Sequence, residues 1–282
     1  MAVSRNNAKK PTSNVRRGGA NMKWPFGKKE NEVRERREDE GQKNQAGGTP
    51  EEIFFRTINE RRKEDPLIGA KIGAKEILNG LVARMKDDRG VHTESLLCAL
   101  GALAGYSCQA SLRKALVEDR GLSEQQVFAI VEAKNGSRYF FGDQINKPLA
   151  ENPLSVWSLA AGAMQRLGIN AAIDLGGIFK HVSETVGSNS FGVPRAPEGH
   201  QPADLPVHYV QYLWPQLLPT AKKYCASPSE WPIMFGLAVQ EGIVLGKDVL
   251  DPLMALSIAM ESAVPMAKAD IAAQSATQPC VD

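Results

Sequence analysis

Two carboxylates on apolar segments are the first candidates for chemistry in this sequence. Glu241 and Glu261 each share a helical face with aliphatic and methionine residues. A carboxylate in apolar surroundings has a raised pKa unless a cation or a hydrogen-bond donor meets it. Such a group can serve as a general base or a metal ligand. The alternative, which we favour, is a structural ion pair or an exposed position at a helix edge.

A long loop at residues 187–206 carries the next candidates. It contains four prolines and three glycines and has no helical or strand periodicity. Loops of this length in compact domains often carry binding or catalysis. The planar guanidinium of Arg195 can hold a carboxylate or phosphate, and His200 and His208 can titrate near neutrality. We predict ligand binding by Arg195 and His200, and expect their alanine variants to lose binding at unchanged thermal stability. A passive connection stiffened by prolines is an equal alternative.

The sequence contains few patterns that are typical of a metal or cofactor site. His181 and Glu184 lie three residues apart on a predicted helix, a spacing that can place both on one metal, but the pattern occurs once. The four cysteines form no Cys-x-x-Cys pair, which leaves zinc ribbons and redox motifs unsupported. We therefore predict no metal and no other cofactor. The chain also lacks a complete catalytic motif.

The elements that must position these residues are mostly helices. Thr49, Pro50 and Glu52 form a capping box with proline at the first helical position, and Asp-Pro or Ser-Pro pairs begin several later segments. Helical spacing predicts helices over 49–63, from 65, from 93, and over 153–167, 171–186, 207–224 and 227–246, with a last one from 251. The fold class is mainly α, a multi-helix globular bundle.

One β-hairpin is predicted at residues 127–145. β-Branched and aromatic residues flank Asn135-Gly136, the dipeptide most typical of a tight hairpin turn. A short helix is the alternative for the first half, because Ser123 and Gln126 also fit a helix cap. Aromatic residues at 139–141 make both faces of the second strand apolar, so both must be covered.

Charge divides the chain in two. Residues 1–48 hold twelve Lys and Arg against six Asp and Glu, and only four of them are Leu, Ile, Val or Phe. Such a segment buries too little apolar area to offset the entropy of ordering it, so we predict a disordered basic tail. Its first 29 residues contain eight bases and no acid, which suits contact with nucleic acid or an anionic surface. Residues 49–282 form one predicted domain, with an end that frays after about residue 269.

The run from Ser95 to Leu112 is uncharged, but its serines and charged flanks favour a buried core helix over a transmembrane segment. We expect no transmembrane segment. Few cysteines and no secretory signal favour the cytoplasm, and the pattern is similar to that of bacterial cytoplasmic proteins, a resemblance that implies no activity.

Three functions compete at this point. The first is a binding or regulatory protein that docks a protein partner or a small anionic ligand through the 187–206 loop, and a homodimer is a further option. The second is an enzyme with His208 or Glu241 as base and Arg195 as anion clamp, which requires the three side chains to share one cleft. The third is a nucleic-acid-associated protein that acts through the basic tail.

Overall fold

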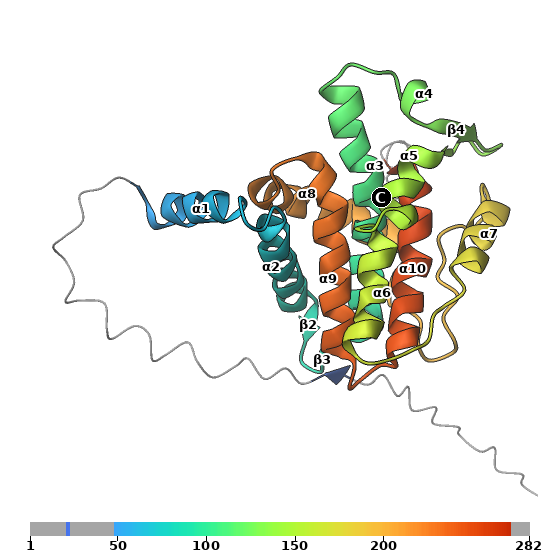
Figure 1. Ribbon diagram of the computed structural model, residues 1–282. Helices are drawn as coiled ribbons and strands as arrows, with labels where there is room; N and C mark the ends of the chain where they lie inside the picture. Colours follow the sequence, from blue (N-terminus) through green and yellow to red (C-terminus); the bar gives the residue numbers. More distant parts are fainter. Residues whose placement is uncertain (1–20, 23–47, 272–282) are drawn as a thin grey trace, which may run out of the picture.

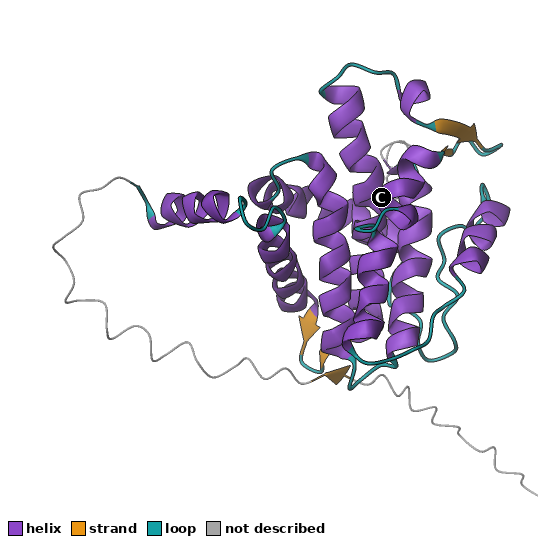
Figure 2. Ribbon diagram, in the orientation of Figure 1, coloured by secondary structure: helices purple, strands orange, loops and turns teal. Residues whose placement is uncertain are grey.

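The computed structural model describes residues 21–22 and 48–271 (Figure 1). This part of the chain is mainly helical, as the sequence predicts (Figure 2). The helices are α1 (Pro50–Arg61), α2 (Ile68–Met85), α3 (Thr93–Leu112), α4 (Glu124–Val127), α5 (Asp143–Asn146), α6 (Val156–Arg166), α7 (Leu175–Thr185), α8 (Pro206–Tyr224), α9 (Trp231–Gly246) and α10 (Pro252–Lys268). Short helical turns follow α3 (Arg113–Glu118) and α5 (Lys147–Glu151) and precede α9 (Pro228–Glu230).

Helix α3 forms the centre of the bundle. It contacts α8, α9 and α10, and almost all of its residues are buried. Among the described residues, α3 and the turn after it form the one helix that is long and apolar enough to cross a membrane. Its most apolar window is 83% buried inside the protein, in line with the predicted core helix. A helix that is apolar all round must be covered on every side, and the neighbouring helices cover this one.

Local signals set several helix starts as predicted. The Thr49 hydroxyl accepts from the Glu52 amide at 3.3 Å, and the Glu52 carboxylate accepts from the Thr49 amide at 2.7 Å. Asp251 caps α10 by accepting from the Met254 amide at 3.0 Å. These side chains pair amides that the first helical turn leaves without partners.

The hairpin is confirmed. Strands β4 (Ala129–Glu132) and β5 (Arg138–Phe141) pair antiparallel, and the turn between them includes Gly136 at a φ of +81°. The competing helical signal is also satisfied, because Ser123 caps α4 immediately before β4. Tyr139 and Phe140 are both buried, so both faces of β5 are covered as expected.

The ends of the predicted domain differ from expectation in two places. Most of the predicted tail lies outside the described residues, but β1 (Asn21–Met22) pairs with β3 (Gly90–His92), whose other edge holds β2 (Lys86–Asp87). At the other end, residues 269–271 do not fray; they are buried, and the Asp270 amide donates to the Arg138 carbonyl at 3.0 Å. The edge of β5 therefore supplies a backbone hydrogen-bond acceptor to residues 269–271.

Candidate functional site

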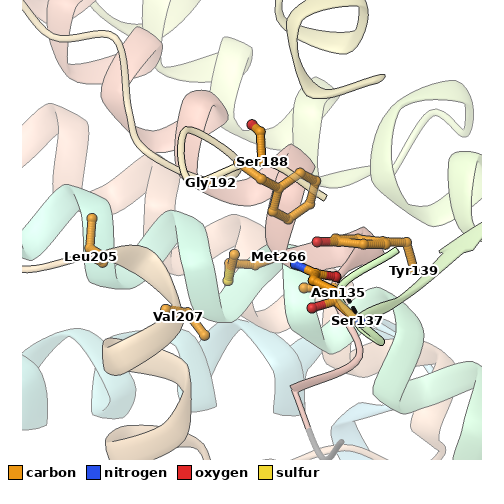
Figure 3. Close-up of a pocket in the computed structure, with 10 residues that line it drawn as sticks. Asn135, Ser137, Tyr139, Ser188, Gly192, Leu205, Val207 and Met266 are labelled. Carbon is orange, nitrogen blue, oxygen red and sulfur yellow. Dashed lines mark hydrogen bonds between the residues drawn. The ribbon is translucent and has the colours of Figure 1, made fainter. Parts of the chain in front are cut away.

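A pocket of about 160 Å³ lies where the hairpin, the 187–206 loop and the helices α8 and α10 meet (Figure 3). Residues from segments far apart in the sequence line it: Asn135, Ser137, Tyr139, Ser188, Phe191, Gly192, Leu205, Val207, Met266 and Ala269. The two elements that sequence analysis set apart, the long loop and the aromatic hairpin, therefore build one site.

Two aromatic rings hold the loop against the hairpin. The rings of Tyr139 and Phe191 meet edge to face with centroids 4.7 Å apart, a geometry that aromatic pairs favour. The Tyr139 hydroxyl also accepts from the Gly187 amide at 3.2 Å, which fixes the start of the loop. Strand β5 thus positions one wall of the pocket. The loop is attached to this strand through the ring and the hydroxyl of Tyr139.

The pocket is lined by neutral groups. Asn135, Ser137 and Ser188 offer amide and hydroxyl groups, while Met266 forms part of the apolar wall (Figure 3). No Lys, Arg, His, Asp or Glu is among the residues that line it. Burying a charged ligand here would leave its charge without a partner, at a large cost in free energy. The site is suited to an uncharged group that has an apolar body and a few polar atoms.

The second half of the loop is tied down by its charged residues. Arg195 donates to one oxygen of Glu261 through Nε at 2.8 Å and Nη2 at 2.5 Å. This hydrogen bond raises the pKa of Arg195, although burial opposes the change. Glu261 is only 6% exposed, and Arg195 is the side chain that hydrogen-bonds to it. The structural ion pair that we favoured for Glu261 is therefore present, and Arg195 is its cation.

His200 belongs to a different anchor. Its Nδ1 lies 2.9 Å from Oε1 of Glu94, a carboxylate that is 5% exposed at the start of α3. His92 Nε2 lies 3.3 Å from the other oxygen, within ion-pair range but without the alignment of a hydrogen bond. The Ser95 hydroxyl accepts from the Ala203 amide at 2.9 Å. The loop is thus fixed, through His200 and Ala203, to Glu94 and Ser95 in the first turn of α3, two residues that were not among the sequence-predicted candidates.

Ser95, His92 and Glu94 have the order of a nucleophile, a base and a carboxylate. The Ser95 hydroxyl lies 2.7 Å from His92 Nδ1, which is hydrogen-bond distance. Ser95 is only 3% exposed, however, and Ala203 covers its oxygen. A carbonyl carbon has no room to approach that oxygen, so the arrangement serves as an anchor in this conformation.

The three groups of the acid–base hypothesis bind three different partners. Glu241 accepts from Arg166 at 2.6 Å, Arg195 binds Glu261, and His208 Nδ1 lies 2.6 Å from Asp204. Burial opposes ionisation of Asp204, but hydrogen bonds from His208 and the Leu205 amide hold its pKa below the usual value. Within the described chain no hydrogen bond or ion pair joins the three groups. The structure gives no support to a shared catalytic cleft.

The metal hypothesis gains no support either. His181 and Glu184 lie on α7, where Glu184 is 3.9 Å from Lys180. Over residues 21–22 and 48–271, no group of three or more His, Cys, Asp and Glu is arranged to hold a metal ion. The predicted contact of residues 1–29 with nucleic acid lies almost wholly outside the described residues and stays a prediction.

A second neutral pocket, of about 380 Å³, lies between α6, the segment after it and α10. Its lining consists of Trp157, Ala161, Met164, Gln165, Ile169, Asn170, Ala171, Ala172 and Leu256. Except for Leu256, these residues come from one continuous stretch of chain. This pocket therefore does not involve the loop or the hairpin.

Lys268, at the end of α10, was not predicted from the sequence as a residue of interest. It is 2% exposed, its Nζ donates to the Asn146 side chain at 2.6 Å, and the ring of Phe141 lies 5.2 Å away. Burial lowers the pKa of Lys268 to about 8. The available signal was a lysine that directly follows a strongly apolar helical segment.

Comparison of the chain with protein-family models, with curated proteins and with solved structures gives no match.

Proposed function

We propose that this protein is a binding protein, and that the pocket between the hairpin and the 187–206 loop receives one uncharged, ring-bearing side chain of a protein partner. The observation that carries the proposal is the shared pocket. Tyr139 of the hairpin and Phe191 of the loop, more than fifty positions apart in the sequence, contribute to one wall of it.

The size of the pocket favours a side chain over a metabolite. Pockets for small molecules usually enclose about 300–1,000 Å³. A cavity of about 150 Å³, by contrast, is large enough for one benzene ring. At about 160 Å³, the pocket matches a single six-membered ring. A protein partner can supply such a ring and gain the rest of its affinity from the surrounding surface.

The charges around the pocket argue against the anionic ligand that the sequence suggested. Arg195 and His200 do not line the pocket, and each contacts a buried carboxylate. An anion at Arg195 would have to displace Glu261 and leave that buried carboxylate unpaired. A neutral occupant meets no such penalty, and the hydroxyl of Ser137 can orient it.

The test uses N-acetyl-phenylalanine amide and N-acetyl-tyrosine amide as probes of the ring site. The full chain is labelled with ¹³C at the methionine methyl groups, and the Met266 signal is assigned with a Met266→Leu variant. We expect both aromatic probes to shift that signal in a saturable way. N-acetyl-glutamate amide and N-acetyl-alanine amide should leave it unchanged at the same concentrations.

A matched pair of variants separates the pocket from the rest of the surface. Ser137→Trp places an indole at the pocket and should abolish the response, whereas Ser183→Trp, on the exposed side of α7, should preserve it. If the aromatic probes shift methionines elsewhere and not Met266, or if Ser137→Trp still responds, the pocket is not the ring site and the proposal is wrong.

A further inference from the structure

Tyr139 brings to the pocket a hydroxyl group whose proton has no acceptor among the described residues. The Tyr139 residue is 3% exposed, and its hydroxyl oxygen already accepts from the Gly187 amide at 3.2 Å. A phenolic hydroxyl can accept and donate at the same time, so its proton is left for an occupant of the pocket. Because a buried donor without an acceptor costs free energy, an occupant that supplies an acceptor is favoured.

Two further polar groups beside Tyr139 are also left for an occupant. Ser137 lies two positions before Tyr139, and side chains alternate along a strand, so the two share one face of the hairpin. In the part of the chain that the structure describes, the Ser137 hydroxyl forms no hydrogen bond. Asn135 accepts from the Ser137 amide at 3.0 Å through its side-chain oxygen, which leaves its NH₂ group as a donor.

The polar groups of Asn135, Ser137 and Tyr139 lie toward one side of the pocket (Figure 3). Leu205 and Val207 lie on the other side. The pocket therefore offers two donors and one further hydroxyl at one end and aliphatic side chains at the other. An occupant that satisfies both ends has a flat apolar body with a single oxygen at its tip.

Among the common side chains, tyrosine has this form without a charge. Its oxygen can accept from the Tyr139 hydroxyl and the Asn135 amide, and its proton can go to the Ser137 oxygen. Tryptophan offers only an N–H donor, and phenylalanine offers no polar atom. A ring that displaces water without replacing its hydrogen bonds loses affinity, so phenylalanine should bind more weakly than tyrosine.

We propose that the pocket selects a tyrosine of the protein partner, and that Asn135, Ser137 and Tyr139 recognise its phenolic oxygen. This inference rests on the function proposed above for the same pocket. It also has a consequence for regulation. Phosphorylation gives a tyrosine about two negative charges, and the described lining of the pocket contains no Lys, Arg or His to pair with them. A phosphorylated tyrosine should therefore be excluded.

The assigned Met266 methyl signal of the full chain measures this selectivity. We expect N-acetyl-tyrosine amide to bind about fivefold to tenfold more tightly than N-acetyl-phenylalanine amide, the factor that one net hydrogen bond contributes. N-acetyl-O-phosphotyrosine amide carries the same ring and should leave the signal unchanged at concentrations at which the tyrosine probe saturates it.

Three variants test which groups recognise the phenolic oxygen. Ser137→Ala and Tyr139→Phe each remove one hydroxyl and should lower the ratio of tyrosine to phenylalanine affinity toward one. Tyr139→Phe also removes the bond to Gly187, but both probes meet the same altered loop, so the ratio still reports the hydroxyl. Ser183→Ala removes a hydroxyl from α7, outside the pocket, and should keep the wild-type ratio.

The outcomes separate this inference from the function on which it rests. Equal affinity of the wild type for the tyrosine and phenylalanine probes overturns the selectivity but keeps the ring site. A ratio that neither Ser137→Ala nor Tyr139→Phe lowers also overturns it, as does a phosphotyrosine probe that binds as tightly as tyrosine. If no aromatic probe shifts Met266, the ring site and the selectivity are both wrong.

Discussion

Gly105 of α3 lies directly against the Ala263 carbonyl of α10, so close that a β-carbon on the glycine would overlap the carbonyl oxygen. Gly101, one turn earlier, meets Ala259 in the same way. The Gly-x-x-x-Gly spacing thus places both glycines on the face of α3 that meets α10, where the absence of a side chain lets the two helices approach closely. The contact positions α10, and Met266 of α10 and Ala269 just past its end both line the pocket.

Gly105→Ala should therefore destabilise the protein strongly. Overpacking a core costs about 1–3 kcal/mol, and here the obstacle is backbone that cannot change rotamer, so we expect the upper end of that range. Gly80→Ala is the control, because its nearest neighbour would be the tip of Arg84 at 3.8 Å. That variant should gain up to about 1 kcal/mol from helix propensity. Urea denaturation of the two variants measures their free energies of unfolding. If Gly105→Ala and Gly80→Ala changed this free energy equally, the close contact between Gly105 and Ala263 would be contradicted.

Removing Arg195 should lower stability, contrary to the unchanged thermal stability expected from the sequence. Arg195→Ala leaves Glu261 buried and unpaired, which costs several kcal/mol for a fully buried pair. The Arg195 side chain is 45% exposed, so solvent screens the pair and we expect about 2 kcal/mol. The Arg195→Ala/Glu261→Gln double variant should recover much of the loss in chemical denaturation.

The pair between Arg166 and Glu241 should contribute far less. Its side chains are 44% and 32% exposed, and surface ion pairs are worth about 0–1 kcal/mol. Glu241→Gln should therefore change the free energy of unfolding by less than about 1 kcal/mol. If Glu241→Gln lowered the free energy of unfolding more than Arg195→Ala does, side-chain exposure would not determine how much these two ion pairs stabilise the protein.

Lys268 should make stability depend on alkaline pH. Burial lowers its pKa to about 8 in the folded chain, whereas an unfolded lysine titrates near 10.4. Between these values the unfolded chain binds more protons, so stability rises with pH. Below pH 8 the folded protein bears the full cost of burying the charged lysine. As the pH rises from about 8 to above 10.4, the free energy of unfolding should increase by about 3 kcal/mol in total.

Lys268→Met should abolish that rise while keeping the fold. Urea unfolding of wild type and variant at a series of pH values between about 7 and 10 isolates the effect, because the other titrating groups are common to both. Identical pH profiles would mean that Lys268 titrates at its ordinary value in the folded protein.

Three thiols should resist alkylation in the native protein. Cys98, Cys108 and Cys225 are buried, and burial raises the pKa of Cys98 and Cys225 to about 12. The thiolate is the reactive form, so iodoacetamide at pH 8 should modify none of the three until the protein is unfolded. Peptide mass spectrometry after alkylation, with and without urea, gives the answer site by site.

The helices were predictable because their signals are local. Caps at Thr49 and Asp251, proline at first-turn positions and apolar spacing act within a few residues, and the structure satisfies them. The Asn135-Gly136 turn is local in the same sense. The start of α2 was placed too early, at Asp65-Pro66, because the chain makes a turn there before the helix begins at Ile68.

The site was predictable only in part. The loop and the hairpin were each selected from sequence, but nothing in either predicts that Tyr139 meets Phe191. Glu94 carried no signal, because a glutamate in a first helical turn is ordinary. Its partner is His200, 106 positions away, and such pairing depends on the folded path of the chain.

By itself, the sequence determined the mainly helical class, the hairpin, the position of the long loop and the apolar nature of α3, because hydrogen bonding, capping and hydrophobic spacing act over short stretches of chain. The tertiary structure alone decided which polar side chains pair with one another. It joined Arg195 to Glu261 and His200 to Glu94, and left a neutral pocket between the loop and the hairpin. The physical reason is that ion pairs and cavities depend on distances between segments far apart in sequence, and those distances exist only once the core has packed.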